Sequence, residues 1–139
     1  MKLVICLGFA VVTALGAQAA PCTKTSFTSA NGKIYKQAET ALVKSGAPQT
    51  ALDLTGELWD SNLNCYERQS VRRLRAATFA MMNDYKSAIE LLEPLTKDES
   101  LPKQQRADTA GSIADLYTQH GEQRAAKPYI ELKEKLLAQ

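Results

Sequence analysis

The chain has 139 residues, a length that suits a single domain. Its 17 Lys and Arg residues nearly balance its 15 Asp and Glu residues, and the basic residues are spread along the sequence. Proteins that bind nucleic acids need a dense basic face. The charge pattern therefore excludes nucleic acid as the expected partner.

Residues 1–19 have the pattern of a secretory signal peptide. Lys2 precedes an apolar run, and Ala17 and Ala19 put small residues at the two positions that a signal peptidase reads. We predict cleavage after Ala19 and export, with the bacterial periplasm as the compartment. An uncleaved membrane anchor is the alternative, but the apolar run of about 14 residues is shorter than the roughly 20 that span a bilayer. After cleavage we expect no stable membrane insertion.

Two cysteines, Cys22 and Cys65, would remain in the mature chain. In an oxidising compartment we expect them to form one disulfide. Closing a loop of this size stabilises the fold by roughly 4 kcal/mol in the chain-entropy model. Redox-active pairs are usually spaced Cys-x-x-Cys, so a structural bridge is favoured over a catalytic one.

Apolar residues recur at helical spacing after an irregular lead-in over residues 20–28, and no strand pattern competes with them. Ser29 is a candidate N-cap, and Pro48 suits the first turn of a helix. Pro94 removes a backbone hydrogen bond, which predicts a kink or an early end near Glu93. The predicted helices cover about 29–45, 48–60, 66–82, 85–93 or beyond, 102–120 and 123–138.

Two sets of residues repeat along the chain at the same interval. The turn residues Gly46, Asn83 and Gly121 stand 37 and 38 residues apart, and an alanine follows each of them at the same distance. These alanines are Ala51, Ala88 and Ala126. Such a period predicts antiparallel helix pairs stacked one after another.

With its flanks, the pattern resembles the tetratricopeptide repeat. The best unit covers residues 69–102, with a small residue at Ala76 and an aromatic residue at Phe79 before the turn at Asn83. The resemblance implies an all-α fold over residues 20–139, with about three helix pairs in a short right-handed solenoid. The units exceed the family's usual length of 34 residues by three or four. A six-helix bundle without repeat geometry is the alternative. Further matches are Tyr85, Ala88 and Leu92 in the second unit, Ala114, Tyr117, Gly121, Ala126 and Ile130 in the third, and Tyr35, Leu42, Gly46 and Ala51 in the first.

The resemblance also implies a concave groove lined by the first helix of each pair, which would bind a protein or peptide segment. The groove would be basic at one end and acidic at the other, so an acidic segment is one candidate partner. Its positions are Lys33, Lys36, Thr40 and Lys44 in the first unit, Ser70, Arg73, Ala77 and Met81 in the second, and Asp108, Gly111, Asp115 and Gln119 in the third.

Two groups of residues near this groove have more than one interpretation. The densest cluster of like charge is Arg68, Arg72, Arg73 and Arg75, which is either a solvated helix face or partly groove lining. Met81 and Met82 are interpreted as core or groove residues rather than as a ligand site.

The sequence offers little chemistry for catalysis. Its single histidine, His120, has no partner histidine for a metal site, and its place at a helix end favours a capping role. There is no glycine-rich phosphate loop and no nucleophile motif. We expect no enzyme activity, no metal and no cofactor.

The expected function is that of an interaction module or scaffold. One alternative is a structural subunit that self-associates through its terminal helix, as a homodimer would. Another is an accessory factor of an envelope enzyme or assembly system.

If residues 1–19 are a signal peptide, protein recovered from its native host will begin at Ala20, because Ala17 and Ala19 are the best pair of small residues for the peptidase. N-terminal sequencing or intact-mass measurement checks this start. A membrane-embedded product that still carries Met1 would contradict export.

Overall fold

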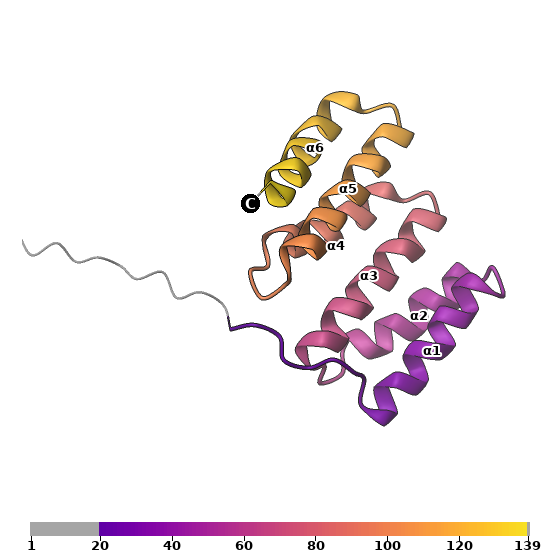
Figure 1. The fold of residues 1–139 in the computed structure, drawn as a ribbon. Helices are drawn as coiled ribbons and strands as arrows, with labels where there is room; N and C mark the ends of the chain where they lie inside the picture. Colours follow the sequence, from indigo (N-terminus) through magenta and orange to yellow (C-terminus); the bar gives the residue numbers. More distant parts are fainter. Residues whose placement is uncertain (1–19, 139) are drawn as a thin grey trace, which may run out of the picture.

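The computed structural model describes residues 20–138, and that range contains six α-helices and no β-strand. The prediction of an all-helical fold is confirmed. The predicted signal peptide, residues 1–19, lies outside the described residues. In chain order the helices are α1 (Ser29–Val43), α2 (Pro48–Trp59), α3 (Cys65–Met81), α4 (Tyr85–Lys97), α5 (Lys103–Gln119) and α6 (Gln123–Leu137) (Figure 1).

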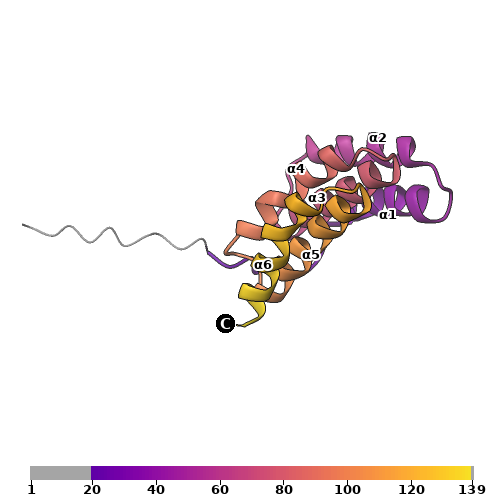
Figure 2. The same ribbon diagram turned by 90° about the horizontal axis from the view of Figure 1, so that it is seen from above.

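Each helix packs against the next one along the chain, so the helices form three successive hairpins. The first hairpin lies at one end of the row and the last hairpin at the other (Figure 1). Seen from above, the axes of the last pair are turned relative to those of the first pair (Figure 2).

Residues with positive φ end the first helix of each hairpin, as the sequence predicts. Gly46 has φ 58°, Asn83 has φ 63° and Gly121 has φ 78°. After α3, the amide of Asp84 donates to the carbonyl of Phe79 at 2.9 Å, which closes a Schellman motif. The left-handed turn residue thus satisfies the last carbonyls of the helix and reverses the chain.

The repeated alanines lie at close contacts between helices. Ala51 and Ala88 are fully buried, and Ala126 is 1% exposed. Ala88 belongs to the largest apolar cluster, in which residues of α3 and α4 meet Leu101 and Ile113. A small side chain at these positions lets the backbones of neighbouring helices approach each other.

The fourth helix does not stop at Pro94, so the predicted early end near Glu93 is wrong. Pro94 and Glu90, whose carbonyl loses its helical partner, both lie on the exposed side of α4, where water can bond that carbonyl. On the other side, Leu92 and Leu95 are buried. This packing keeps the helix intact past the proline.

Met81 and Met82 are not core residues, which corrects one of their two predicted roles. They are 56% and 40% exposed, respectively, and lie where α3 gives way to the turn. Val43, at the end of α1, is 73% exposed. The helical pattern extends to these residues, but the neighbouring helices do not cover the last turn.

Substitution of Ala88 tests the close contact. We expect Ala88→Leu to overpack the site and to lower the free energy of unfolding by about 1–3 kcal/mol. Lys86→Leu, at an exposed position of the same helix, should be nearly neutral. Urea denaturation of both variants measures the difference. Equal, small effects at the two sites would contradict the packing role of the alanine.

Candidate functional site

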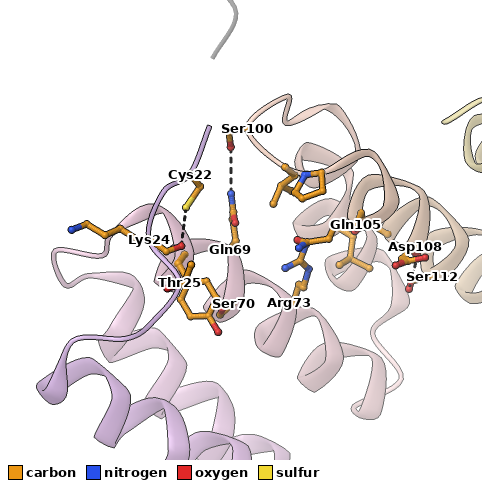
Figure 3. A pocket seen from close by; sticks show the side chains of 15 residues that line it. Cys22, Lys24, Thr25, Gln69, Ser70, Arg73, Ser100, Gln105, Asp108 and Ser112 are labelled. Carbon is orange, nitrogen blue, oxygen red and sulfur yellow. Dashed lines mark hydrogen bonds between the residues drawn. The ribbon is translucent and has the colours of Figure 1, made fainter. Parts of the chain in front are cut away.

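An open groove of about 570 Å³ lies between α3, α5 and the N-terminal end of the described chain (Figure 3). We call residues 20–25 the N-terminal strap. The helices contribute mostly polar side chains, which extend from the first turn to Arg73 in α3 and to Ser112 in α5. The groove is lined by Cys22, Lys24 and Thr25 of the strap, by Tyr66, Gln69, Ser70 and Arg73 of α3, by Leu92 of α4, by Ser100, Leu101 and Pro102, and by Gln105, Asp108, Thr109 and Ser112 of α5.

The structure brings some of the predicted site residues into this groove and leaves others outside it. Ser70, Arg73 and Asp108 line it. Lys33, Lys36 and Thr40 line a second hollow, of about 500 Å³, between α1 and α2. Neither of these two hollows is lined by five further predicted residues, all of them exposed: Lys44, Ala77, Met81, Asp115 and Gln119.

Gly111 is the remaining predicted position, and it faces α6. A Cβ atom built on Gly111 would lie 3.3 Å from Nζ of Lys133. The side chain of Lys133 therefore covers this part of α5. The predicted residues of the three units thus do not form one continuous groove.

Hydrogen bonds link α3 to α5 and to the loop between α4 and α5. Nη2 of Arg73 donates to Oε1 of Gln105 at 3.1 Å. Nε2 of Gln69 lies 3.4 Å from Oγ of Ser100 (Figure 3). The same atom lies 3.4 Å from Oδ2 of Asp98. These bonds hold the two helical walls at a set distance while the space between them stays open.

Few charged side chains line the groove, and two of them, Arg73 and Asp108, already make hydrogen bonds. Arg73 is half-buried in the groove, and Lys24 adds a second basic residue on the strap. Asp108 is the acidic lining residue, and its carboxylate accepts a hydrogen bond from Nε2 of Gln104 at 2.9 Å. The lining therefore carries two basic side chains and one acidic side chain among mostly polar residues.

A disulfide attaches the strap to the start of α3 beside the groove, and this bond was predicted for the two cysteines. Cys22 and Cys65 are bonded, with their Cα atoms 5.8 Å apart. Cys65 is the first residue of α3. Sequence reasoning missed the strap and also most of the other lining residues, such as Gln69, Ser100 and Gln105. The predicted bridge was the available signal for the strap, because it places Cys22 beside the start of a groove-forming helix.

Glu67 fixes the start of α3. Oδ1 of the N-cap residue Asn64 accepts from the amide of Glu67 at 3.0 Å, and Oε2 of Glu67 accepts from the amide of Asn64 at 2.9 Å. This reciprocal pair is a capping box. The sequence Asn-x-x-Glu carried the signal for it.

The same carboxylate binds the segment that leads into α1. Its Oε1 accepts from the amide and the hydroxyl of Thr28, at 2.7 and 2.8 Å, and its Oε2 accepts from Nδ2 of Asn31 at 3.1 Å. Glu67 is fully buried. Burial alone would raise the pKa of Glu67, but the hydrogen bonds from Asn64, Thr28 and Asn31 outweigh it and hold the pKa below its usual value.

The arginines of the predicted cluster do not share one surface: one lines the groove, and two lie over the ring of Trp59. Arg73 lines the groove, whereas Arg72 and Arg75 lie over the ring of Trp59, with their Cζ atoms 5.0 and 5.8 Å from its centroid. Burial lowers the pKa of both stacked guanidinium groups, which stay charged at neutral pH. Arg75 also donates to the carbonyl of Leu52 at 3.3 Å.

His120 occupies the C-cap of α5, in agreement with its predicted place at a helix end. Its Nδ1 lies 2.9 Å from the carbonyl oxygen of Leu116, and its ring stacks on Tyr85 with centroids 3.9 Å apart. Within residues 20–138, no group of three or more His, Cys, Asp or Glu side chains is arranged to hold a metal ion. None of the helices in that range is long and apolar enough to cross a membrane.

Comparisons of the chain with models of protein families, with curated proteins and with solved structures find no match. A function for this chain therefore has to be argued from its own geometry.

The buried carboxylate makes stability depend on pH. Because the pKa of Glu67 is lower in the folded than in the unfolded state, its contribution is complete above the unfolded value and is lost as the pH falls through the folded value. We expect Glu67→Gln to lower the free energy of unfolding by roughly 1–3 kcal/mol at pH 7.

The difference between wild type and Glu67→Gln should shrink as the pH falls below about 4. Thermal unfolding followed by circular dichroism measures it, with Glu99→Gln at an exposed position as the control. A difference that is the same at acid and neutral pH would contradict this role of the ionised carboxylate.

Proposed function

We propose that this protein is an exported interaction module that binds a segment of a partner protein in the groove between α3, α5 and the N-terminal strap. The observation that carries the proposal is the groove itself. It is open, it is lined mainly by polar side chains, and hydrogen bonds between its walls hold it in shape. A preformed site of this kind loses little conformational entropy when a ligand binds.

The arrangement of the helices supports a tetratricopeptide-like solenoid of three pairs. Turn residues of positive φ recur at Gly46, Asn83 and Gly121, and buried alanines recur at the matching place in each second helix. Each helix also packs against the next. In this architecture the first helices of successive pairs form the binding face, and α3 and α5 are first helices here.

The lining favours an acidic segment, or a segment that ends in a free carboxylate. The Arg73 guanidinium is the cation that lies between the two helical walls (Figure 3). A guanidinium group matches the geometry of a carboxylate and can donate two parallel hydrogen bonds to it. In the free protein its Nη2 atom binds the neutral amide of Gln105, which is a weaker partner than a carboxylate.

An oxidising compartment, with the bacterial periplasm as the proposed location, fits the bonded pair Cys22 and Cys65. Disulfides between residues far apart in sequence are typical of exported proteins and rare in the cytosol. The proposed leader, residues 1–19, would supply the route.

A structural subunit that pairs through its last helix is the second candidate. Ile130 and Leu137 of α6 are 45% and 51% exposed, an apolar surface at the end of the row of helices. Sedimentation analysis separates the two functions, because a subunit of this kind would be dimeric at micromolar concentration and a binding module need not be.

Reversal of one charge tests the groove. We expect Arg73→Glu to weaken the binding of a fluorescein-labelled acidic peptide of about ten residues with a free C-terminal carboxylate. Fluorescence anisotropy measures the Kd. Part of the attraction is long-range, so the wild-type affinity should fall as NaCl is raised from about 50 to about 500 mM.

Arg124→Glu, at an exposed position outside the groove, is the matched control for net charge. If the peptide binds equally well to the Arg73→Glu variant and in high salt, binding in the groove is wrong.

A further inference from the structure

The N-terminal strap forms one side of the groove but belongs to neither of the helices opposite it. Cys22, Lys24 and Thr25 line the groove, and Figure 3 shows the strap running past the first turns of α3. Lys24 and Thr25 are exposed and Cys22 is half-buried. The strap therefore lies on the surface of the helices and is not packed into their core.

The disulfide is the bond that holds the strap in this place. Among the residues that the structure describes, no hydrogen bond joins residues 20–25 to a helix. Sγ of Cys22 lies 3.6 Å from the carbonyl oxygen of Lys24, but a bridged sulfur carries no proton, so this contact within the strap is not a hydrogen bond.

Firm attachment begins at the residues that follow the strap. The carbonyl of Ser26 accepts from Nδ2 of Asn64 at 3.4 Å. The ring of Phe27 packs on Tyr35 and Tyr66, with centroids 4.3 and 5.5 Å away. Thr28 then binds Glu67. Loss of the disulfide would therefore free residues 20–25 and leave the chain from Ser26 onward in place.

We propose that the Cys22–Cys65 disulfide holds the strap as a wall of the binding groove, so that reduction of this bond removes the wall and weakens binding. The inference rests on the proposed function and adds its regulation by redox state. A wall that is fixed before the ligand arrives costs no ordering entropy on binding. A free strap would have to be ordered each time.

Reduction of the Cys22–Cys65 disulfide needs a dithiol reductant, such as dithiothreitol or an oxidoreductase with a Cys-x-x-Cys pair. Cys65 is exposed, so a thiolate of the reductant can attack its Sγ atom, and Cys22 leaves as a thiolate that takes up a proton. The second thiol of the reductant then displaces Cys65. Two electrons pass to the protein, which gains two thiols, and the reductant becomes a disulfide.

The test compares the full-length protein, purified with its bridge intact, before and after reduction by dithiothreitol. We expect the Kd for the acidic peptide used above to rise about tenfold or more on reduction, because the preformed wall is lost. A variant with Cys22→Ser and Cys65→Ser should bind as weakly in either redox state. Circular dichroism confirms that helix content is retained under each condition.

A pair of variants that keep the disulfide tests the wall independently of stability. Thr25→Trp places a large ring on the groove lining and should weaken peptide binding, whereas Thr23→Trp, two residues away on the exposed strap and outside the lining, should not. Equal affinity for Thr25→Trp and Thr23→Trp would overturn the assignment of the strap to the groove.

The outcomes separate the strap from the groove. If Arg73→Glu weakens binding while reduction leaves the Kd unchanged, the groove stands and the role of the strap is wrong. Tighter binding after reduction would also overturn the proposal, because the strap would then be a cover. If the oxidised wild type does not bind the peptide at all, the proposed function is wrong, and the role of the strap, which rests on it, is wrong as well.

Discussion

The Glu67 carboxylate lies where two parts of the chain meet, and the start of α3 and the entry into α1 both depend on it. It caps α3 through Asn64 and binds Thr28 and Asn31 at the start of α1. A buried carboxylate is tolerated in a protein interior only when hydrogen bonds replace its lost hydration. Here the donors come from two backbone amides and two side chains, so the charge can be held only when both segments are in place.

This junction also sets the position of the groove. Thr28 fixes the end of the segment that leads into α1. The disulfide between Cys22 and Cys65 fixes the beginning of that segment, and Cys65 lies two residues before Glu67 in the sequence. The strap therefore reaches the groove at the point where α3 begins. Polar residues of α3 and α5 line the groove there. Arg73 is hydrogen-bonded to Gln105 of α5, and Gln69 is hydrogen-bonded to Ser100 in the loop before α5.

Away from the junction, the fold is held by repeated contacts between neighbouring helices. Buried alanines allow close packing, and left-handed turn residues reverse the chain after each first helix. The buried hydroxyls of Thr55 and Thr78 donate back to carbonyls of their own helices, so they need no partner across the interface.

The sequence by itself determined the number of helices, their turns and the disulfide, because each depends on local chemistry or on the count of cysteines. Helical spacing, positive φ at Asn83 and the small side chain of Ala88 can be read without knowing what lies opposite. The continuation of α4 past Pro94 does not follow from local pattern, because the burial of Leu92 and Leu95 outweighs one lost backbone bond and burial is a property of the packed structure.

The tertiary structure alone decided which predicted site residues share a surface. Residues on the first helices of different pairs can be assigned to one face by their register, but whether they line one groove depends on what covers them. The side chain of Lys133 lies over Gly111, the lysines of α1 line a hollow with α2, and the strap lies beside Ser70 and Arg73. Each of these contacts joins segments far apart in the sequence, and no local pattern encodes them.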